Sequence, residues 1–198
     1  MVTTPRPIDA LVIGGSAGAL EVLMTVLPAL PRDLSAAVVI VLHLAPHKPS
    51  YLRDVLSQRT ALAVREPDDK EPMLPGTVYV GPPNYHLLIE RNRTLALSVD
   101  DAVNFSRPSI DVLFESAAEA LGPSVAGVLL TGANDDGARG LARIRASGGI
   151  TVVQSPETAS ASAMPEAGIR AAAIDHVLPP ERIGPLLVEL AKRSGGSR

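Results

Sequence analysis

The chain has 198 residues, of which 46% are hydrophobic but only 3% aromatic, so we expect one domain with an aliphatic core. Its formal net charge of −3 gives no electrostatic case for a nucleic-acid-binding surface, and the lack of cysteine excludes disulfides, thiolate catalysis and cysteine metal sites. The first residues lack the features of a signal peptide, and no apolar run is long enough to span a membrane. We therefore expect a cytoplasmic protein without membrane insertion.

The first third of the chain alternates short apolar runs with amphipathic stretches. The run "AAVVIVL" is apolar throughout, as is typical of a parallel strand covered on both faces. Leucines recur at helical spacing after the first apolar run. These patterns predict strands at 8–13, 36–42 and 62–64 and helices at 19–30 and about 49–59.

The segment 65–108 has a different texture, because short apolar runs alternate with clusters of turn-forming residues. We interpret it as an antiparallel hairpin insertion at about 77–98. The next helix is expected from about residue 107 to residue 121, with Ser109 as its N-cap.

The last third returns to alternating strands and helices. Strands are predicted at 124–131, 150–154 and 175–178, and helices at 138–147, 164–173 and 180–193. The alternation predicts an α/β fold with a doubly wound, mainly parallel sheet sandwiched by helices. We expect a tail at 1–7, a single domain at 8–193 and a disordered tail at 194–198.

Polar side chains follow three of the predicted strands directly. Ser16 comes after the first strand, His43 ends the second, and Asn134, Asp135 and Asp136 follow the strand at 124–131. In open α/β sheets, sites form at the carboxyl ends of strands. These are the residue types of a nucleophile, a base and an orienting carboxylate.

The turn "GGSAG" around Ser16 matches G-x-S-x-G, whose small residues hold a hydroxyl clear of the backbone. It does not match the dinucleotide fingerprint G-x-G-x-x-G, because Ser16 occupies the slot of the second glycine. A phosphate-binding loop of the Walker type needs Gly-Lys-Ser/Thr, and no lysine precedes Lys48. A plain strand-to-helix turn remains an alternative for this stretch alone.

The partners of Ser16 also have simpler interpretations. His43 could be a hydrogen-bonded core residue at the end of a buried strand, and either Asp135 or Asp136 could cap the following helix. The chain shows no His-x-x-His or Glu-x-x-His spacing, so we expect no metal and no cofactor. The order Ser16, His43, Asp136 also differs from that of α/β hydrolases, in which the acid precedes the histidine.

Several motifs in order resemble the catalytic domain of the CheB-type chemotaxis protein-glutamate methylesterases. They are "IGGSAGALE", "VVIVLHLAP", "LPGTVYVGPPNYHL", "RPSIDVLFESAA", "VLLTGANDDGARGL" and "AMPEAGI", and the similarity extends over about residues 8 to 190. The resemblance implies hydrolysis of γ-glutamyl methyl esters on chemoreceptors, and it can also imply deamidation of receptor glutamines. The implied partner is the cytoplasmic domain of a methylated chemoreceptor, with no nucleic acid.

The resemblance also implies residue roles. Ser16 becomes the nucleophile, His43 the general base and acid, and Asp136 the partner of His43. The oxyanion-binding backbone N–H of the family falls on Ala133. The N–H of Ala17, next to the nucleophile, is a second candidate by the usual logic of a nucleophile elbow.

The sequence departs from the family pattern at six positions: Ala17 and Ala19 stand for Thr and Gly, Leu42 for a frequent Gln, Ala133 and Asn134 for Met and Gly, and Ala163 for the Gly before Met-Pro. Family members commonly carry an N-terminal receiver domain, whereas about seven residues precede the first strand here. On this expectation, either a separate response regulator controls the activity of the domain or the activity is constitutive. Two alternatives stay open: a catalytically weak signalling scaffold, and an anion- or nucleotide-binding α/β module.

Overall fold

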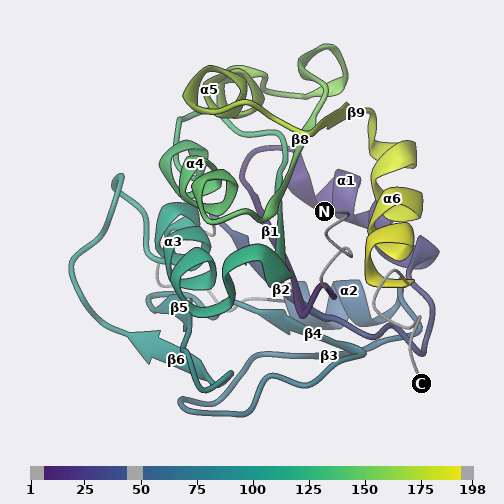
Figure 1. Cartoon of the computed structure of the whole chain (residues 1–198), viewed down its shortest axis with the longest axis vertical. Helices are drawn as coiled ribbons and strands as arrows, with labels where there is room; N and C mark the ends of the chain where they lie inside the picture. Colours follow the sequence, from purple (N-terminus) through teal and green to yellow (C-terminus); the bar gives the residue numbers. More distant parts are fainter. Residues whose placement is uncertain (1–6, 44–50, 193–198) are drawn as a thin grey trace, which may run out of the picture.

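The computed structural model describes residues 7–43 and 51–192. Apart from Pro7, the predicted tails at 1–7 and 194–198 lie outside the described residues, and so does the predicted helix start at Pro49 and Ser50. The main sheet has seven strands, all parallel, in the order β3-β4-β2-β1-β7-β8-β9 (Figure 1). Its strands are β1 (Ala10–Gly15), β2 (Ala37–Leu42), β3 (Ala63–Arg65), β4 (Thr77–Val80), β7 (Val125–Leu129), β8 (Ile150–Gln154) and β9 (His176–Leu178).

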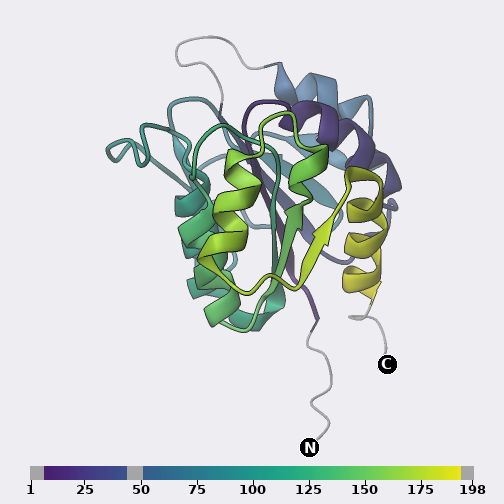
Figure 2. The same ribbon diagram turned by 90° about the horizontal axis from the view of Figure 1, so that it is seen from above.

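Helices cover both faces of this sheet (Figures 1 and 2). Side chains of β1 alternate between two cores, since Leu11 and Ile13 pack on one face and Val12 on the other. The first face is covered by α1 (Ala19–Val26), α2 (Leu52–Ser57) and α6 (Pro180–Lys192). The second is covered by α3 (Ile110–Leu121), α4 (Ala138–Ala146) and α5 (Ala163–Ala171). The predicted doubly wound α/β fold is confirmed.

The hairpin is smaller than the sequence predicts. Only β5 (His86–Ile89) and β6 (Leu95–Ser98) pair in antiparallel fashion, and β4 instead joins the main sheet between β3 and β2. The reason is that β4 is buried on both sides, with Val78 in one core and Tyr79 in the other. A strand with two apolar faces belongs inside a covered parallel sheet.

The strand order places a switch point beside β1. From β1 the chain builds the sheet outward through β2 and β4 on one side and through β7 and β8 on the other. Loops that follow strands on the two sides of such a point diverge and leave a crevice at the carboxyl edge. Among residues 7–43 and 51–192, no helix is both long enough and apolar enough to cross a membrane.

Candidate active site

The three predicted site segments follow three consecutive strands of the sheet. Gly15 pairs with Leu42, so Ser16 and His43 come next to each other at the ends of β1 and β2. On the other side, the Ser16 N–H donates to the Thr131 carbonyl, 2.9 Å away, just after β7. Because adjacent strands lie about 5 Å apart, Ser16 sits between the two loops that carry the other candidates.

The turn after β1 is tight enough to require its small residues. Gly18 has a φ of 81° and forms the N-cap of α1, and a side chain at this position would overlap Ser160. Ser16 is half-buried and Ala17 is exposed. No hydrogen bond joins the Ser16 hydroxyl to another described residue, so the hydroxyl stands at the end of β1 with its donor uncommitted.

His43 and Asp136 form a direct side-chain pair. Nε2 of His43 lies 2.7 Å from Oδ2 of Asp136, and the two side chains are 13% and 0% exposed. Nδ1 is then the ring nitrogen left for another partner. Asp135 is exposed, so the carboxylate that meets His43 is Asp136.

The Asp136 carboxylate also caps a helix, but not the one that follows it. The N-cap of α4 is Gly137, whereas the Asp136 oxygens accept the backbone N–H groups of Ile110 and Asp111, at 2.7 and 3.1 Å. Ser109 is the N-cap residue of α3 as predicted, yet its hydroxyl does not cap the helix and donates instead to Asp136 Oδ1 at 2.8 Å. The N-terminus of α3 therefore holds the same carboxylate that His43 contacts.

These contacts decide the charge of Asp136. Burial acts to raise the pKa of this carboxyl, but the hydrogen bonds from His43, the Ile110 N–H, Asn104 and the Asp111 N–H outweigh it and hold the pKa below its usual value. The group is therefore a stable anion beside the imidazole. The described residues contain no group of three or more His, Asp or Glu side chains that could hold a metal ion.

The neighbouring buried acid, Asp111, is shifted the other way. Burial raises the pKa of Asp111, the hydrogen bond from the Gly140 N–H opposes this, and the charge of Asp136 adds to the increase. On acidification we expect Asp111 to take up a proton first and Asp136 only below the usual aspartate range of about 4. Stability from Asp136 should thus be present above that range and be lost as the pH falls through its folded-state pKa. Carboxyl-carbon NMR would check the order, and titration of Asp136 before Asp111 would contradict it.

Comparisons with known proteins point to one family. Residues 11–187 match the family described as CheB methylesterase. The catalytic domain of Thermotoga maritima CheB methylesterase superposes with a TM-score of 0.88 at 32% identity, covering 92% of this chain and 98% of that one. The chain belongs to the CheB methylesterase family.

This chain covers different shares of two of its relatives. A Leptospira interrogans protein with the provisional name protein-glutamate methylesterase/protein-glutamine glutaminase is 45% identical over 92% of this chain and 94% of its own length. A Geobacter metallireducens protein-glutamate methylesterase/protein-glutamine glutaminase 4 is 37% identical over 94% of this chain, which spans only 54% of that relative.

Three polar residues of this CheB methylesterase domain were missed by the sequence analysis. Asn104 Nδ2 donates to Asp136 Oδ1 at 2.9 Å, and the Ser109 hydroxyl donates to the same oxygen. His86, the first residue of β5, is buried and its Nδ1 accepts the Ser109 N–H at 3.2 Å. The only sequence signal for these contacts was the position of Ser109 before a helix, and it predicted that Ser109 caps that helix and not that it donates to Asp136.

We expect Asn104→Gly to lower catalytic turnover by about tenfold. Glycine keeps the positive φ of 52° without strain and removes the amide that donates to Asp136, so the carboxylate loses one of its five donors. The rate of methanol release and the melting temperature would be measured together. Asn92→Gly, in the exposed turn between β5 and β6, is the control. A turnover within twofold of the unmodified protein would show that the amide does not position Asp136.

The two predicted oxyanion donors lie beside the serine turn and beyond β7. Ala17 and Ala133 are both exposed, and neither N–H donates to another described residue. The loops that carry them are joined, because the Thr131 hydroxyl donates to the Ala17 carbonyl at 3.0 Å. Both amides are thus uncommitted donors on connected loops.

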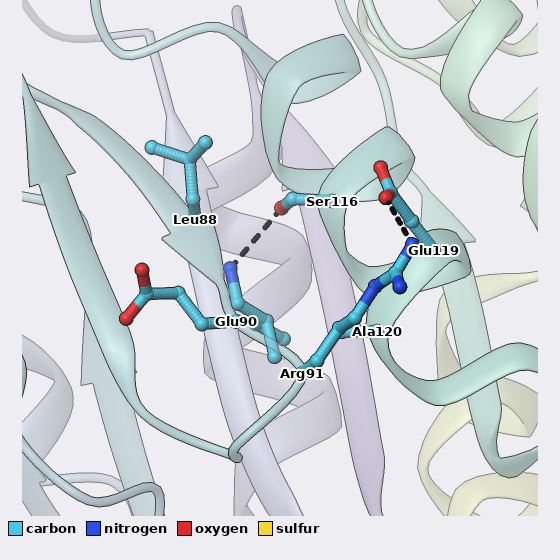
Figure 3. A pocket seen from close by; sticks show the side chains of 7 residues that line it. Leu88, Glu90, Arg91, Ser116, Glu119 and Ala120 are labelled. Carbon is cyan, nitrogen blue, oxygen red and sulfur yellow. Dashed lines mark hydrogen bonds and ion pairs between the residues drawn. The ribbon is translucent and has the colours of Figure 1, made fainter.

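A depression of about 290 Å³ lies elsewhere, between β5 and α3 (Figure 3). Its one serine, Ser116, is engaged on both sides: it accepts the Ile89 N–H and donates to the Leu113 carbonyl. Arg91 and Glu119 form an ion pair across it, 2.7 Å apart. This depression therefore offers no activated nucleophile, and the candidate site remains at the ends of β1, β2 and β7.

Proposed function

We propose that this chain is a serine hydrolase that removes methyl groups from methyl-esterified glutamate side chains of chemoreceptors. Ser16 is the nucleophile, His43 the general base and acid, and Asp136 the partner of His43. The observation that carries the proposal is the hydrogen-bonded pair of His43 and buried Asp136, with His43 one strand from Ser16. The family and the names of its members support the same activity.

In this reaction, His43 Nδ1 accepts the Ser16 hydroxyl proton as the oxygen attacks the ester carbonyl. Asp136 accepts a hydrogen bond from Nε2–H and stabilises the imidazolium that forms. The N–H groups of Ala17 and Ala133 donate to the oxyanion of the tetrahedral intermediate. Methanol leaves with the proton from His43, and a water molecule activated by the same imidazole then hydrolyses the glutamyl ester of Ser16.

The same steps suit glutamine deamidation, with ammonia as the leaving group instead of methanol. The names of both relatives pair the two activities. Because the acyl-enzyme is identical in the two reactions, a single set of side chains serves both.

The substrate is the cytoplasmic domain of a methylated chemoreceptor, so the protein acts in the cytoplasm as one catalytic domain at 8–193. A separate response regulator is the proposed partner for control of its activity.

The test is methanol release from membranes that carry a carboxyl-methylated chemoreceptor. We expect Ser16→Ala to lower the rate at least about a thousandfold, since it removes the nucleophile. Ser57→Ala, an exposed serine on α2, is the matched control and should keep the full rate. Equal rates for the unmodified protein and Ser16→Ala would refute the proposal.

A further inference from the structure

A two-residue turn between β6 and α3 has an unusual residue at its tip. Val103 and Ser106 exchange two backbone hydrogen bonds, of 3.2 and 2.9 Å, around Asn104 and Phe105. The φ angles of these two central residues are 52° and 60°. Two positive φ values in a two-residue hairpin loop define a type I′ turn, which favours Asn-Gly.

Phe105 occupies the glycine position of this turn at a cost to the fold. A bulky residue with positive φ is strained, and Phe105 is fully exposed, so no packing offsets the strain. Single exposed apolar residues are ordinary on protein surfaces. The other exposed large apolar residues, however, have none of this strain: Tyr51, Leu74, Tyr85, Val99, Ile169 and Val177.

The turn is anchored to the candidate active site. Asn104 Nδ2 lies 2.9 Å from oxygens of both Asp136 and Asp111, and Asp136 in turn contacts His43. The Arg107 guanidinium donates to the Val99 carbonyl at 2.7 Å, which closes the base of the connection. The connection between β6 and α3 projects from the body of the molecule (Figure 1). Phe105 is thus an aromatic ring in solvent, one residue from a side chain that binds Asp136.

We propose that Phe105 contacts the protein substrate, packing against an apolar side chain near the methyl-esterified glutamate. The inference rests on the proposed function. A ring so exposed is no part of a concave wall, as a small ligand would need, whereas a projecting aromatic anchor suits the surface of a macromolecule. The contact buries the ring only in the complex, which accounts for an aromatic residue where glycine would favour the free protein.

The test compares Phe105→Gly with Val177→Ala, a control on β9 at the far edge of the sheet. Two rates are measured for each variant: methanol release from methylated receptor membranes, and labelling of Ser16 by a small fluorophosphonate. We expect Phe105→Gly to lower kcat/KM for methanol release about tenfold more than it lowers labelling, mainly through KM. Its melting temperature should equal or exceed that of the unmodified protein, because glycine relieves the turn. Phe105→Tyr keeps an aromatic ring at this position and should therefore keep the kcat/KM of the unmodified protein.

Each other outcome overturns the inference. Equal losses in labelling and in methanol release would mean that Phe105 acts through Asp136 and not through the substrate. Full methanol release by Phe105→Gly, with the unmodified protein well above Ser16→Ala, would refute the substrate contact and leave the proposed function intact. No release by the unmodified protein would refute both.

Discussion

Replacing Asp136 by Asn should lower methanol release about ten-thousandfold and also destabilise the fold. Five donors converge on this carboxylate, from His43, Asn104, Ser109 and the backbone of Ile110 and Asp111. An amide of the same shape offers one acceptor oxygen and turns an NH₂ group toward the remaining donors. Either the imidazole or the end of α3 then loses its partner.

The size of each effect follows from what the carboxylate does. Loss of the anion leaves His43 without the group that fixes its tautomer and stabilises its charged form. Buried donors left unpaired, together with the loss of the buried charge, should lower the free energy of unfolding by about 2–5 kcal/mol. Asp135→Asn is the matched control, because this neighbouring carboxylate is exposed and should tolerate the change.

Turnover measured on methylated receptor membranes and urea unfolding would be compared for the two variants. If Asp136→Asn kept more than a tenth of the turnover, the assigned role of Asp136 beside His43 would be wrong. If it lost turnover with no change in unfolding free energy, the carboxylate would not be the cap of α3 that the hydrogen bonds indicate.

The parts of the site predicted from sequence are those fixed by strand order along the chain. Ser16, His43 and Asp136 each come shortly after an apolar run, and carboxyl ends of parallel strands meet at one edge of a sheet. Local signals therefore predict that the three residues lie near this edge. The sequence alone could not show that β4 joins the main sheet and not the hairpin, since a run of four mostly apolar residues fits both settings.

The support of Asp136 depends on contacts between distant segments. Asn104 reaches the carboxylate from an irregular connection, and α3 supplies its N-terminus to a residue more than 20 positions later. A capping residue is normally sought just before its own helix, and that rule singled out Ser109 for α3. Here the cap comes from another loop, so only the tertiary structure shows that Ser109 donates to Asp136 instead.

A second large effect is expected from Gly14→Ala, within the apolar part of β1. A Cβ atom at Gly14 would overlap Cγ2 of Ile110 and lie 3.1 Å from its Cβ. Neither partner can move freely, because Gly14 pairs with Val41 and Leu129 in the sheet and Ile110 is fully buried at the start of α3. We expect a loss of about 1–3 kcal/mol in the free energy of unfolding.

The same substitution should lower turnover about a hundredfold, although Gly14 contacts no reacting atom. Ile110 donates its N–H to Asp136 at 2.7 Å, so displacing the start of α3 moves the carboxylate away from His43. The double variant Gly14→Ala/Ile110→Ala removes the overlapping atoms and should recover turnover relative to Gly14→Ala. Ile110→Ala alone leaves a cavity and should lower the free energy of unfolding by about 2–5 kcal/mol. A coupling near zero in this cycle would show that the tight approach of β1 to α3 does not position Asp136.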